Sequence, residues 1–74
     1  MKNNPYDTYL KKFGLNLRKI RKEKGYTMES LANEAEIEYR QFGRIERGEI
    51  NTSIISILRI SEVLGTEMSD LFIF

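Results

Sequence analysis

The sequence predicts an all-α fold. Apolar residues recur at steps of three and four over much of the chain, which is the spacing of one face of a helix. Residues that favour helices are plentiful, and proline occurs once, at Pro5. A chain of 74 residues forms one domain at most and buries one small core. We therefore expect residues 1–74 to fold as a single helical domain.

The first expected helix lies in the N-terminal third of the chain. It is expected to start with Asn4 as the cap and Pro5 as the first helical residue. Its apolar stripe consists of Tyr6, Leu10, Phe13, Leu17 and Ile20. Gly14 weakens the middle of this helix by about 1 kcal/mol relative to alanine. The alternative is therefore a helix that begins near Phe13, with residues 1–12 as an N-terminal extension.

Residues 28–46 are expected to form two short helices joined by a tight turn. Thr27 is a good cap for the first of them, and Gly48 ends the second. The buried face of the first helix contains Leu31, Ala32 and Ala35. On the second helix, which covers residues 39–46, Phe42 and Ile45 are expected to point inward. The residues expected on its outer side are Arg40, Gly43, Arg44 and Arg47.

A fourth helix and a short terminal turn are expected in the last third of the chain. Thr52 or Ser53 caps the fourth helix, and Gly65 ends it. Its inner stripe is expected to be Ile54, Ile57, Leu58, Ser61 and Leu64. Residues 66–74 form a C-terminal turn and tail, in which Ser69 caps a last turn around Leu71.

The residues that the chain lacks narrow its chemistry. There is no cysteine for a disulfide or a thiolate metal site, and no histidine to act as an acid or base near neutral pH. No glycine-rich phosphate loop or carboxylate pair stands out, so we expect no enzyme, metal, cofactor or small-molecule ligand. There is no signal peptide and no apolar run of the roughly 20 residues that span a bilayer. We expect a cytoplasmic protein that does not contact a membrane.

Charge is divided unevenly along the chain, although the net charge is only +1. Residues 1–24 carry eight basic and two acidic side chains, whereas residues 25–74 carry four basic and nine acidic ones. Three of those four basic side chains lie between Arg40 and Arg47. The distribution of charge matters more than its sum for attraction to an anionic partner, so this segment is compatible with nucleic-acid binding.

In their order and spacing, these elements resemble the Cro/C1-type helix-turn-helix family of bacterial and phage regulators, often called the Xre family. The resemblance covers about residues 13–72. The matching residues are Arg18-Lys19-Ile20-Arg21, Gly25, Thr27, Leu31-Ala32, Arg44-Ile45-Glu46-Arg47-Gly48, Asn51, Leu64-Gly65 and Asp70-Leu71-Phe72. The resemblance implies a compact five-helix, lambda-repressor-like DNA-binding domain.

The resemblance also implies a transcriptional regulator that binds double-stranded DNA as a dimer, with the second helix of the pair in the major groove. The positions that would read bases are Tyr39, Arg40, Gln41 and Arg44. The chemistry agrees, because arginine can donate two hydrogen bonds to guanine, and glutamine can do the same to adenine. Phosphate contacts are expected at helix N-termini and basic side chains. These positions are Arg18, Thr27, Met28, Arg47, Asn51, Thr52 and Ser53.

Further positions match the family or depart from it. Arg21 and Glu46 match two residues that form an ion pair between the first and third helices of the family. Met28 replaces a glutamine that braces the recognition helix, and Glu38 stands where a Ser or Thr cap is usual. Glu36 occupies a turn position that is often glycine, and a left-handed conformation there would cost on the order of 1 kcal/mol.

Two apolar features are not accounted for by the expected core. Ile55 lies off the inner stripe of the fourth helix, and the chain ends on Phe72, Ile73 and Phe74. The tail either folds back onto its own core or joins Ile55 in a homodimer interface, and we favour the homodimer. Such a dimer would bind a pseudo-palindromic operator with half-sites about 10 bp apart, or a multiple of that.

The size of the chain favours one subtype of regulator. A compact single-domain chain resembles the controller proteins of restriction–modification systems more than a phage-type repressor or a stand-alone antitoxin. The alternative function is a protein-interaction module on the same scaffold, since fold does not fix function. The outer face of residues 39–47 separates the two interpretations, because its three arginines favour DNA.

Overall fold

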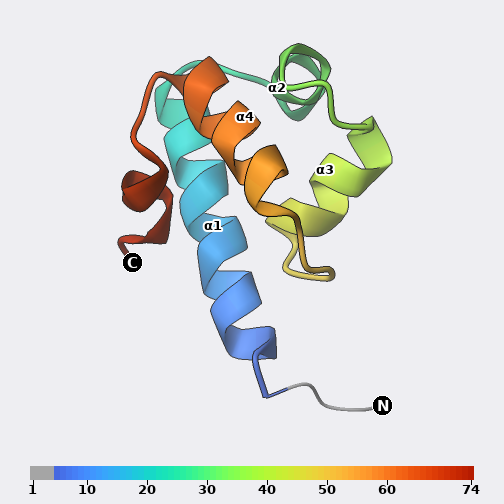
Figure 1. Ribbon diagram of the computed structural model, residues 1–74, viewed down its shortest axis with the longest axis vertical. Helices are drawn as coiled ribbons and strands as arrows, with labels where there is room; N and C mark the ends of the chain where they lie inside the picture. Colours follow the sequence, from blue (N-terminus) through green and yellow to red (C-terminus); the bar gives the residue numbers. More distant parts are fainter. Residues whose placement is uncertain (1–4) are drawn as a thin grey trace.

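The structure, a computed structural model, describes residues 5–74, which form four α-helices and a terminal 3₁₀ helix with no strand. These elements are α1 (Asp7–Glu23), α2 (Met28–Glu34), α3 (Tyr39–Glu46), α4 (Ile54–Leu64) and η1 (Met68–Phe72). The long helix α1 runs through the molecule, with α2 and α3 on one side of it and η1 on the other (Figure 1). The predicted all-α class is confirmed, although the fifth element is a 3₁₀ helix. No helix within residues 5–74 is long and apolar enough to cross a membrane.

Helix α1 begins two residues later than the sequence predicted. Pro5 and Tyr6 form a turn, and Tyr6 occupies the N-cap position without a side-chain cap bond, so the first helical residue is Asp7 and not Pro5. The predicted cap, Asn4, lies outside the described residues. From Asp7 the helix continues without a break to its last residue. Residues 7–12 are therefore part of the helix and not a looser extension.

Gly14 allows α1 to pack closely against α3. A Cβ atom placed on Gly14 would lie 2.7 Å from the carbonyl carbon of Glu46 and 3.0 Å from the carbonyl oxygen of Ile45. Both atoms belong to the backbone, so they cannot turn aside as a flexible side chain would. The residue that weakens α1 as an isolated helix is thus the one that lets it cross the end of α3.

One apolar core lies between the helices. Its largest fully buried side chains are Leu17, Leu31, Phe42, Ile45, Ile60 and Leu71. The inner face predicted for α2 is confirmed, because Leu31, Ala32 and Ala35 are all buried. The inward direction predicted for Phe42 and Ile45 on α3 is confirmed as well. The core therefore fixes the orientation of both helices of the predicted pair.

The stripe predicted for α4 is partly wrong. Ile57, Ser61 and Leu64 are buried as expected, and so is Ile60, which was not predicted. By contrast, Ile54 is 72% exposed and Leu58 is 37% exposed. Helix α4 is apolar on several sides, so its own pattern does not select a single stripe. Its contacts with α2 and η1 decide which side is buried.

The C-terminal segment is fastened to α1 by hydrogen bonds. Glu67, and not the predicted Ser69, occupies the N-cap position of η1, and its N–H donates to the Asp70 carboxylate at 3.2 Å. The turn starts earlier than predicted because Glu67 has an acidic partner three residues later. The side-chain amide of Asn16 donates to the carbonyl oxygens of Asp70 at 3.2 Å and Leu71 at 2.9 Å. These bonds place η1 against the middle of α1.

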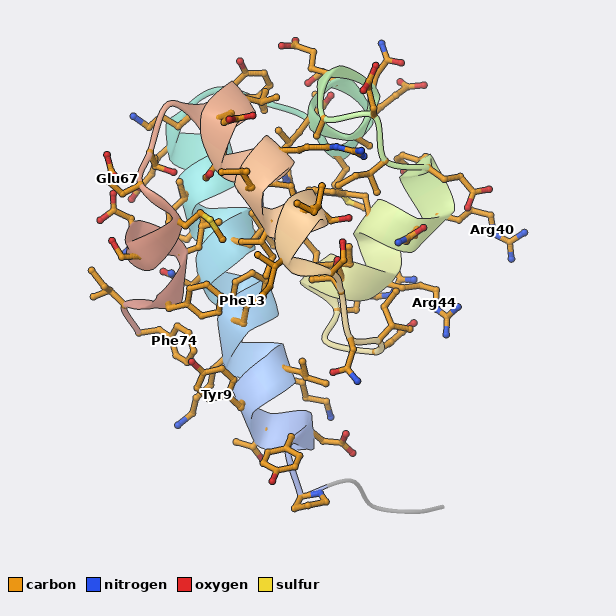
Figure 2. The ribbon with its side chains drawn as sticks, in the orientation of Figure 1. Tyr9, Phe13, Arg40, Arg44, Glu67 and Phe74 are labelled. Atoms are coloured by element: carbon orange, nitrogen blue, oxygen red, sulfur yellow. The ribbon has the colours of Figure 1, made fainter. Side chains whose placement is uncertain are left out.

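The last three residues turn back along α1. The ring centroids of Phe72 and Phe13 are 4.9 Å apart. Those of Phe74 and Tyr9, both labelled in Figure 2, are 5.1 Å apart. Even so, Phe72, Ile73 and Phe74 remain 39%, 69% and 49% exposed. The tail thus folds back onto its own chain, one of the two alternatives, and still leaves apolar surface uncovered.

Candidate nucleic-acid interface

A buried ion pair fixes α3 against α1. Arg21 Nε donates to Glu46 Oε2 at 2.6 Å, and Arg21 Nη2 donates to Glu46 Oε1 at 3.3 Å. Both side chains are buried, and Arg21 Nη1 also donates to the carbonyl oxygen of Tyr26 at 2.8 Å. A bidentate pair of this kind is geometrically specific, and a buried pair fixes geometry more surely than it adds stability. The pair that the resemblance implied therefore ties α1 and α3 to the segment that precedes α2.

The turn between α2 and α3 contains a non-glycine residue in the left-handed region. Glu36 has a φ of 59°, which costs on the order of 1 kcal/mol for a residue with a Cβ atom. Glu38 occupies the N-cap position of α3 but makes no side-chain cap bond. The start of α3 is therefore held by its neighbours in the core, Ile37 and Phe42, and not by a side-chain cap.

The outer side of α3 carries the four residues predicted to read bases. They are Tyr39, Arg40, Gln41 and Arg44, and all four are exposed. Arg40 and Arg44 project from α3 away from the rest of the molecule (Figure 2). Tyr39, Arg40 and Arg44 line one groove, whereas Gln41 lines a neighbouring groove together with both arginines. The structure thus brings the predicted residues together on one accessible surface.

Gly43 was predicted on this outer side, but it is buried. A Cβ atom on Gly43 would lie 3.0 Å from Nη1 of Arg47 and 3.2 Å from Cε of Met28, so these two side chains cover it. Met28 is partly buried and also packs against the apolar core. At the position where the family usually has glutamine, this chain therefore braces α3 by apolar packing.

A second groove continues the basic surface from α3 onto α1. Its lining includes Lys11, Leu15 and Arg18 of α1 together with Met28, Gly43 and Arg47. Arg18 and Arg47 were predicted to contact phosphate, but Lys11 was not, because the sequence left open whether residues 1–12 belong to the helix. Steps of four and three residues separate Lys11, Leu15 and Arg18, so a continuous helix places them on one face. That spacing was the signal available in the sequence.

At the helix N-termini predicted to contact phosphate, the hydroxyl groups of Thr27 and Ser53 act as caps. Thr27 Oγ1 accepts from the N–H of Ser30, and the N–H of Thr27 donates to Ser30 Oγ, both at 3.0 Å. The sequence predicted the cap but not its reciprocal partner, because Ser30 is neither Glu nor Gln. Ser53 Oγ accepts the cap bond of α4. The Thr52 hydroxyl oxygen is buried without a partner among residues 5–74, and Asn51 is exposed.

Glu49 is a charged residue of this surface that was not predicted. Its Oε2 accepts from Arg47 Nε at 2.9 Å, and its Oε1 accepts from Arg47 Nη2 at 3.5 Å. The same Oε1 lies 3.8 Å from Nε of Arg44. The hydrogen bond from Arg47 holds the pKa of Glu49 below its ordinary value, and the same bond raises the pKa of Arg47. One carboxylate thus pairs with two arginines of the outer side of α3.

The end of α3 explains the position of Glu49. Gly48 has a φ of 72°, and its N–H donates to the carbonyl oxygen of Ile45 at 3.1 Å. The N–H of Glu49 donates to the carbonyl oxygen of Arg44 at 2.9 Å. This is the Schellman motif, which brings the side chains of Arg44 and Glu49 together. The glycine that ends the helix therefore already indicated that residues 44 and 49 would be neighbours.

Comparison with known proteins identifies the family to which the chain belongs. The helix-turn-helix family model matches residues 17–71, which is most of the chain. The chain belongs to the helix-turn-helix family. It is 37% identical over 62 residues to the control protein C.MunI of a Mycoplasma species, covering 82% of this chain and 84% of that protein. The crystal structure of the restriction–modification controller protein C.AhdI from Aeromonas hydrophila matches with a TM-score of 0.86 and 37% identity. That match covers 88% of this chain and 98% of the other.

Membership of the helix-turn-helix family confirms the predicted resemblance to the Cro/C1-type regulators. The family consists of DNA-binding regulators and not of enzymes, as the sequence also predicted. The matched segment begins inside α1 and ends within η1, so it contains the helix pair, the ion pair and Glu49. Lys11 and the residues from Phe72 to Phe74 lie outside it.

Proposed function

We propose that the chain regulates transcription by binding double-stranded DNA sequence-specifically, as a homodimer on a pseudo-palindromic operator. The observation that carries this proposal is the exposed arginine-bearing side of α3. Its inner side is buried in the core, and the buried pair of Arg21 and Glu46 holds its end on α1. A recognition helix needs this combination of a free polar side and a fixed axis to enter the major groove in one register.

In this proposal, each residue of α3 makes the DNA contact that suits the chemistry of its side chain. Arg40 and Arg44 each donate two hydrogen bonds to a guanine, and Gln41 does the same to an adenine. Tyr39 contacts a phosphate or packs on a thymine methyl group. These are the contacts that select a sequence, because they reach base edges.

Phosphate contacts come from two flanking regions. Arg18 and Arg47 supply charge from the groove shared by α1 and α3. The starts of α2 and α4 supply backbone N–H groups, because the Thr27 and Ser53 hydroxyl groups are engaged as caps and the Thr52 hydroxyl is buried. The proposed backbone donors lie in the segments Thr27-Met28 and Asn51-Thr52-Ser53.

The proposed dimer uses apolar surface that the fold leaves exposed. Ile55 is 55% exposed, as its place off the stripe suggested. Ile54 and Leu58, which were expected in the core, lie exposed on the same helix, and the tail adds further apolar surface. Exposed apolar patches commonly mark interfaces, so α4 and the tail support association of two copies. A twofold dimer would hold the two α3 helices one turn of DNA apart, about 34 Å.

The proposed subtype is the controller protein of a restriction–modification system. The proteins reported above as similar, C.MunI and C.AhdI, are both named as controllers, and each aligns with more than four fifths of this chain. A regulator of this type acts on DNA in the cytoplasm.

The experiment that tests the proposal begins with a pool of random-sequence duplexes. Repeated selection with the parent protein is expected to enrich a two-part site whose halves are related by a twofold axis. Arg40→Ala and Arg44→Ala should each weaken binding to that selected duplex by roughly 1–3 kcal/mol and relax discrimination at one position. Binding is measured by fluorescence anisotropy over a range of salt concentrations.

Lys19→Ala is the control, because Lys19 is an exposed basic residue of α1 that lines none of the grooves beside α3. It should bind the selected duplex like the parent. The proposed face is wrong if both α3 variants also bind like the parent. An affinity that does not change with salt would favour the protein-interaction module instead, because phosphate contacts make DNA binding steeply salt-dependent.

A further inference from the structure

Glu49 places a negative charge on a surface that the proposed function assigns to a polyanion. The groove that contains Tyr39, Arg40, Arg44 and Arg47 also contains Glu49. An exposed ion pair contributes little to folding stability, so the stability of the protein does not require this carboxylate. The backbone bond from Glu49 to Arg44 is made by its N–H, which any residue other than proline supplies.

The two arginines that Glu49 contacts are held unequally. Arg47 uses both Nε and Nη2 on the carboxylate, at 2.9 Å and 3.5 Å, while its Nη1 lies over Gly43. Its guanidinium is thus bound to Glu49 on one side and lies beside Gly43 on the other. Arg44 is only loosely held, with its Nε 3.8 Å from the carboxylate, although the two arginine side chains are about equally exposed, at 54% and 57%. A phosphate would therefore have to displace Glu49 to bind Nε or Nη2 of Arg47. Arg44, by contrast, can easily exchange Glu49 for a group of the DNA.

We propose that Glu49 is a selectivity residue, an internal counter-charge that keeps Arg47 and Arg44 from binding the phosphates of unrelated DNA. This inference rests on the proposed function. A phosphate that takes Arg47 from Glu49 replaces one anion with another and leaves the carboxylate unpaired beside a polyanion, so little is gained. In the cognate complex Arg47 contacts phosphate through Nη1, while Nε and Nη2 stay on Glu49. A base edge that accepts two hydrogen bonds from Arg44 needs only the loose contact to break. Glu49 thus weakens non-specific binding more than it weakens binding to the cognate site.

The test uses Glu49→Gln, which removes the charge of the side chain. The variant keeps the size of the side chain and the hydrogen bond from the backbone N–H of residue 49 to Arg44. Two probes are used, the selected duplex and a mixed-sequence duplex of the same length without that site. In 0.1 M salt the variant should bind the mixed-sequence duplex about five- to tenfold more tightly, because one released arginine makes one additional phosphate contact. The slope of log affinity against log salt should become steeper by about one. Affinity for the selected duplex should rise about twofold or less, so the ratio between the two affinities falls.

Two further proteins separate this mechanism from others. Glu34→Gln removes the same charge from α2, in a groove that contains none of the α3 arginines, and should leave both affinities within about twofold of the parent. In an Arg47→Gln background, Glu49→Gln should lose most of its effect on the mixed-sequence duplex. The melting temperature of Glu49→Gln should equal that of the parent, because the backbone hydrogen bond from residue 49 to Arg44 remains.

Several results would overturn the inference. It is wrong if Glu49→Gln binds the mixed-sequence duplex like the parent. It is also wrong if only the affinity for the selected duplex falls, since Glu49 would then merely position Arg47, or if Glu34→Gln has an equal effect. A parent protein that binds neither duplex would refute the proposed function itself, whereas a parent that binds both and an inert Glu49→Gln would refute this inference alone.

Discussion

Gly14→Ala is expected to destabilise the protein, although the same change stabilises an isolated helix. Alanine is favoured over glycine in a helix interior by about 1 kcal/mol. In the folded protein the new methyl group would lie 2.7 Å from the carbonyl carbon of Glu46, well inside the 3.4 Å at which ordinary contact begins. Helices α1 and α3 would have to move apart by roughly 1 Å to admit it.

The size of the effect follows from these two opposing contributions. Overpacking of a core costs typically 1–3 kcal/mol, and the upper end applies here because the obstacle is backbone that cannot rotate away. After the gain in helix propensity of about 1 kcal/mol, the net loss is about 2 kcal/mol. In a domain of this length that corresponds to a fall in melting temperature of roughly 8–16 °C.

Urea and thermal unfolding of the parent and the variant measure this difference directly. A synthetic peptide of residues 7–23 is the control, since there the alanine should increase the helical circular dichroism signal. The separation of the helices should also lengthen the contact between Arg21 and Glu46, which the chemical shifts of the Arg21 guanidinium would report. A Gly14→Ala protein that is as stable as the parent would refute the packing argument.

Three further predictions concern the ion pair, the tail and Glu49. Arg21→Met should cost about 3–5 kcal/mol in urea unfolding because it leaves the Glu46 carboxylate buried alone, and adding Glu46→Leu should recover most of that loss. If the double variant is no more stable than the single one, the cost does not come from the unpaired charge. Deletion of Phe72–Phe74 should shift sedimentation from dimer to monomer, and an unchanged dimer would exclude the tail from the interface. The pKa of the Glu49 carboxyl, measured by NMR, should lie below its ordinary value and should rise toward that value in Arg47→Gln. Because this pKa is depressed, the contribution of the pair is present above the ordinary pKa of a glutamate and is lost as pH falls through the depressed one. An unchanged pKa in Arg47→Gln would contradict this assignment.

The sequence predicted best those features that depend on local periodicity and on strong end signals. The inner faces of α2 and α3 were predicted because each has a few apolar residues at clear helical spacing against polar neighbours. Thr27, Gly48 and Gly65 were assigned to helix ends for the same local reasons, and they lie at those ends. These features need no knowledge of what packs against the helix.

Features that depend on a neighbouring element were missed. Helix α4 has isoleucine or leucine on most of its sides, so only its contacts with α2 and η1 show that Ile60 is buried and Ile54 is not. Gly14 looked like a weak point because the approaching backbone of α3 is absent from the sequence. Glu49 was overlooked because a Schellman turn brings it back to Arg44, a contact that helical spacing does not describe.

The position of helix α1 bears on the spacing between the two half-sites that a dimer would accept. One of its faces carries Lys11 and Arg18 toward the surface of α3, while its other contacts, through Tyr9 and Asn16, hold the C-terminal segment. Its 17 residues form a rod about 25 Å long, so a tilt of about 5° at one end would move the other end by about 2 Å. In a dimer joined through the tail, α1 would transmit a movement of the tail to α3. Small changes in the tail would then alter the distance between the two recognition helices, and with it the spacing of sites that the protein accepts.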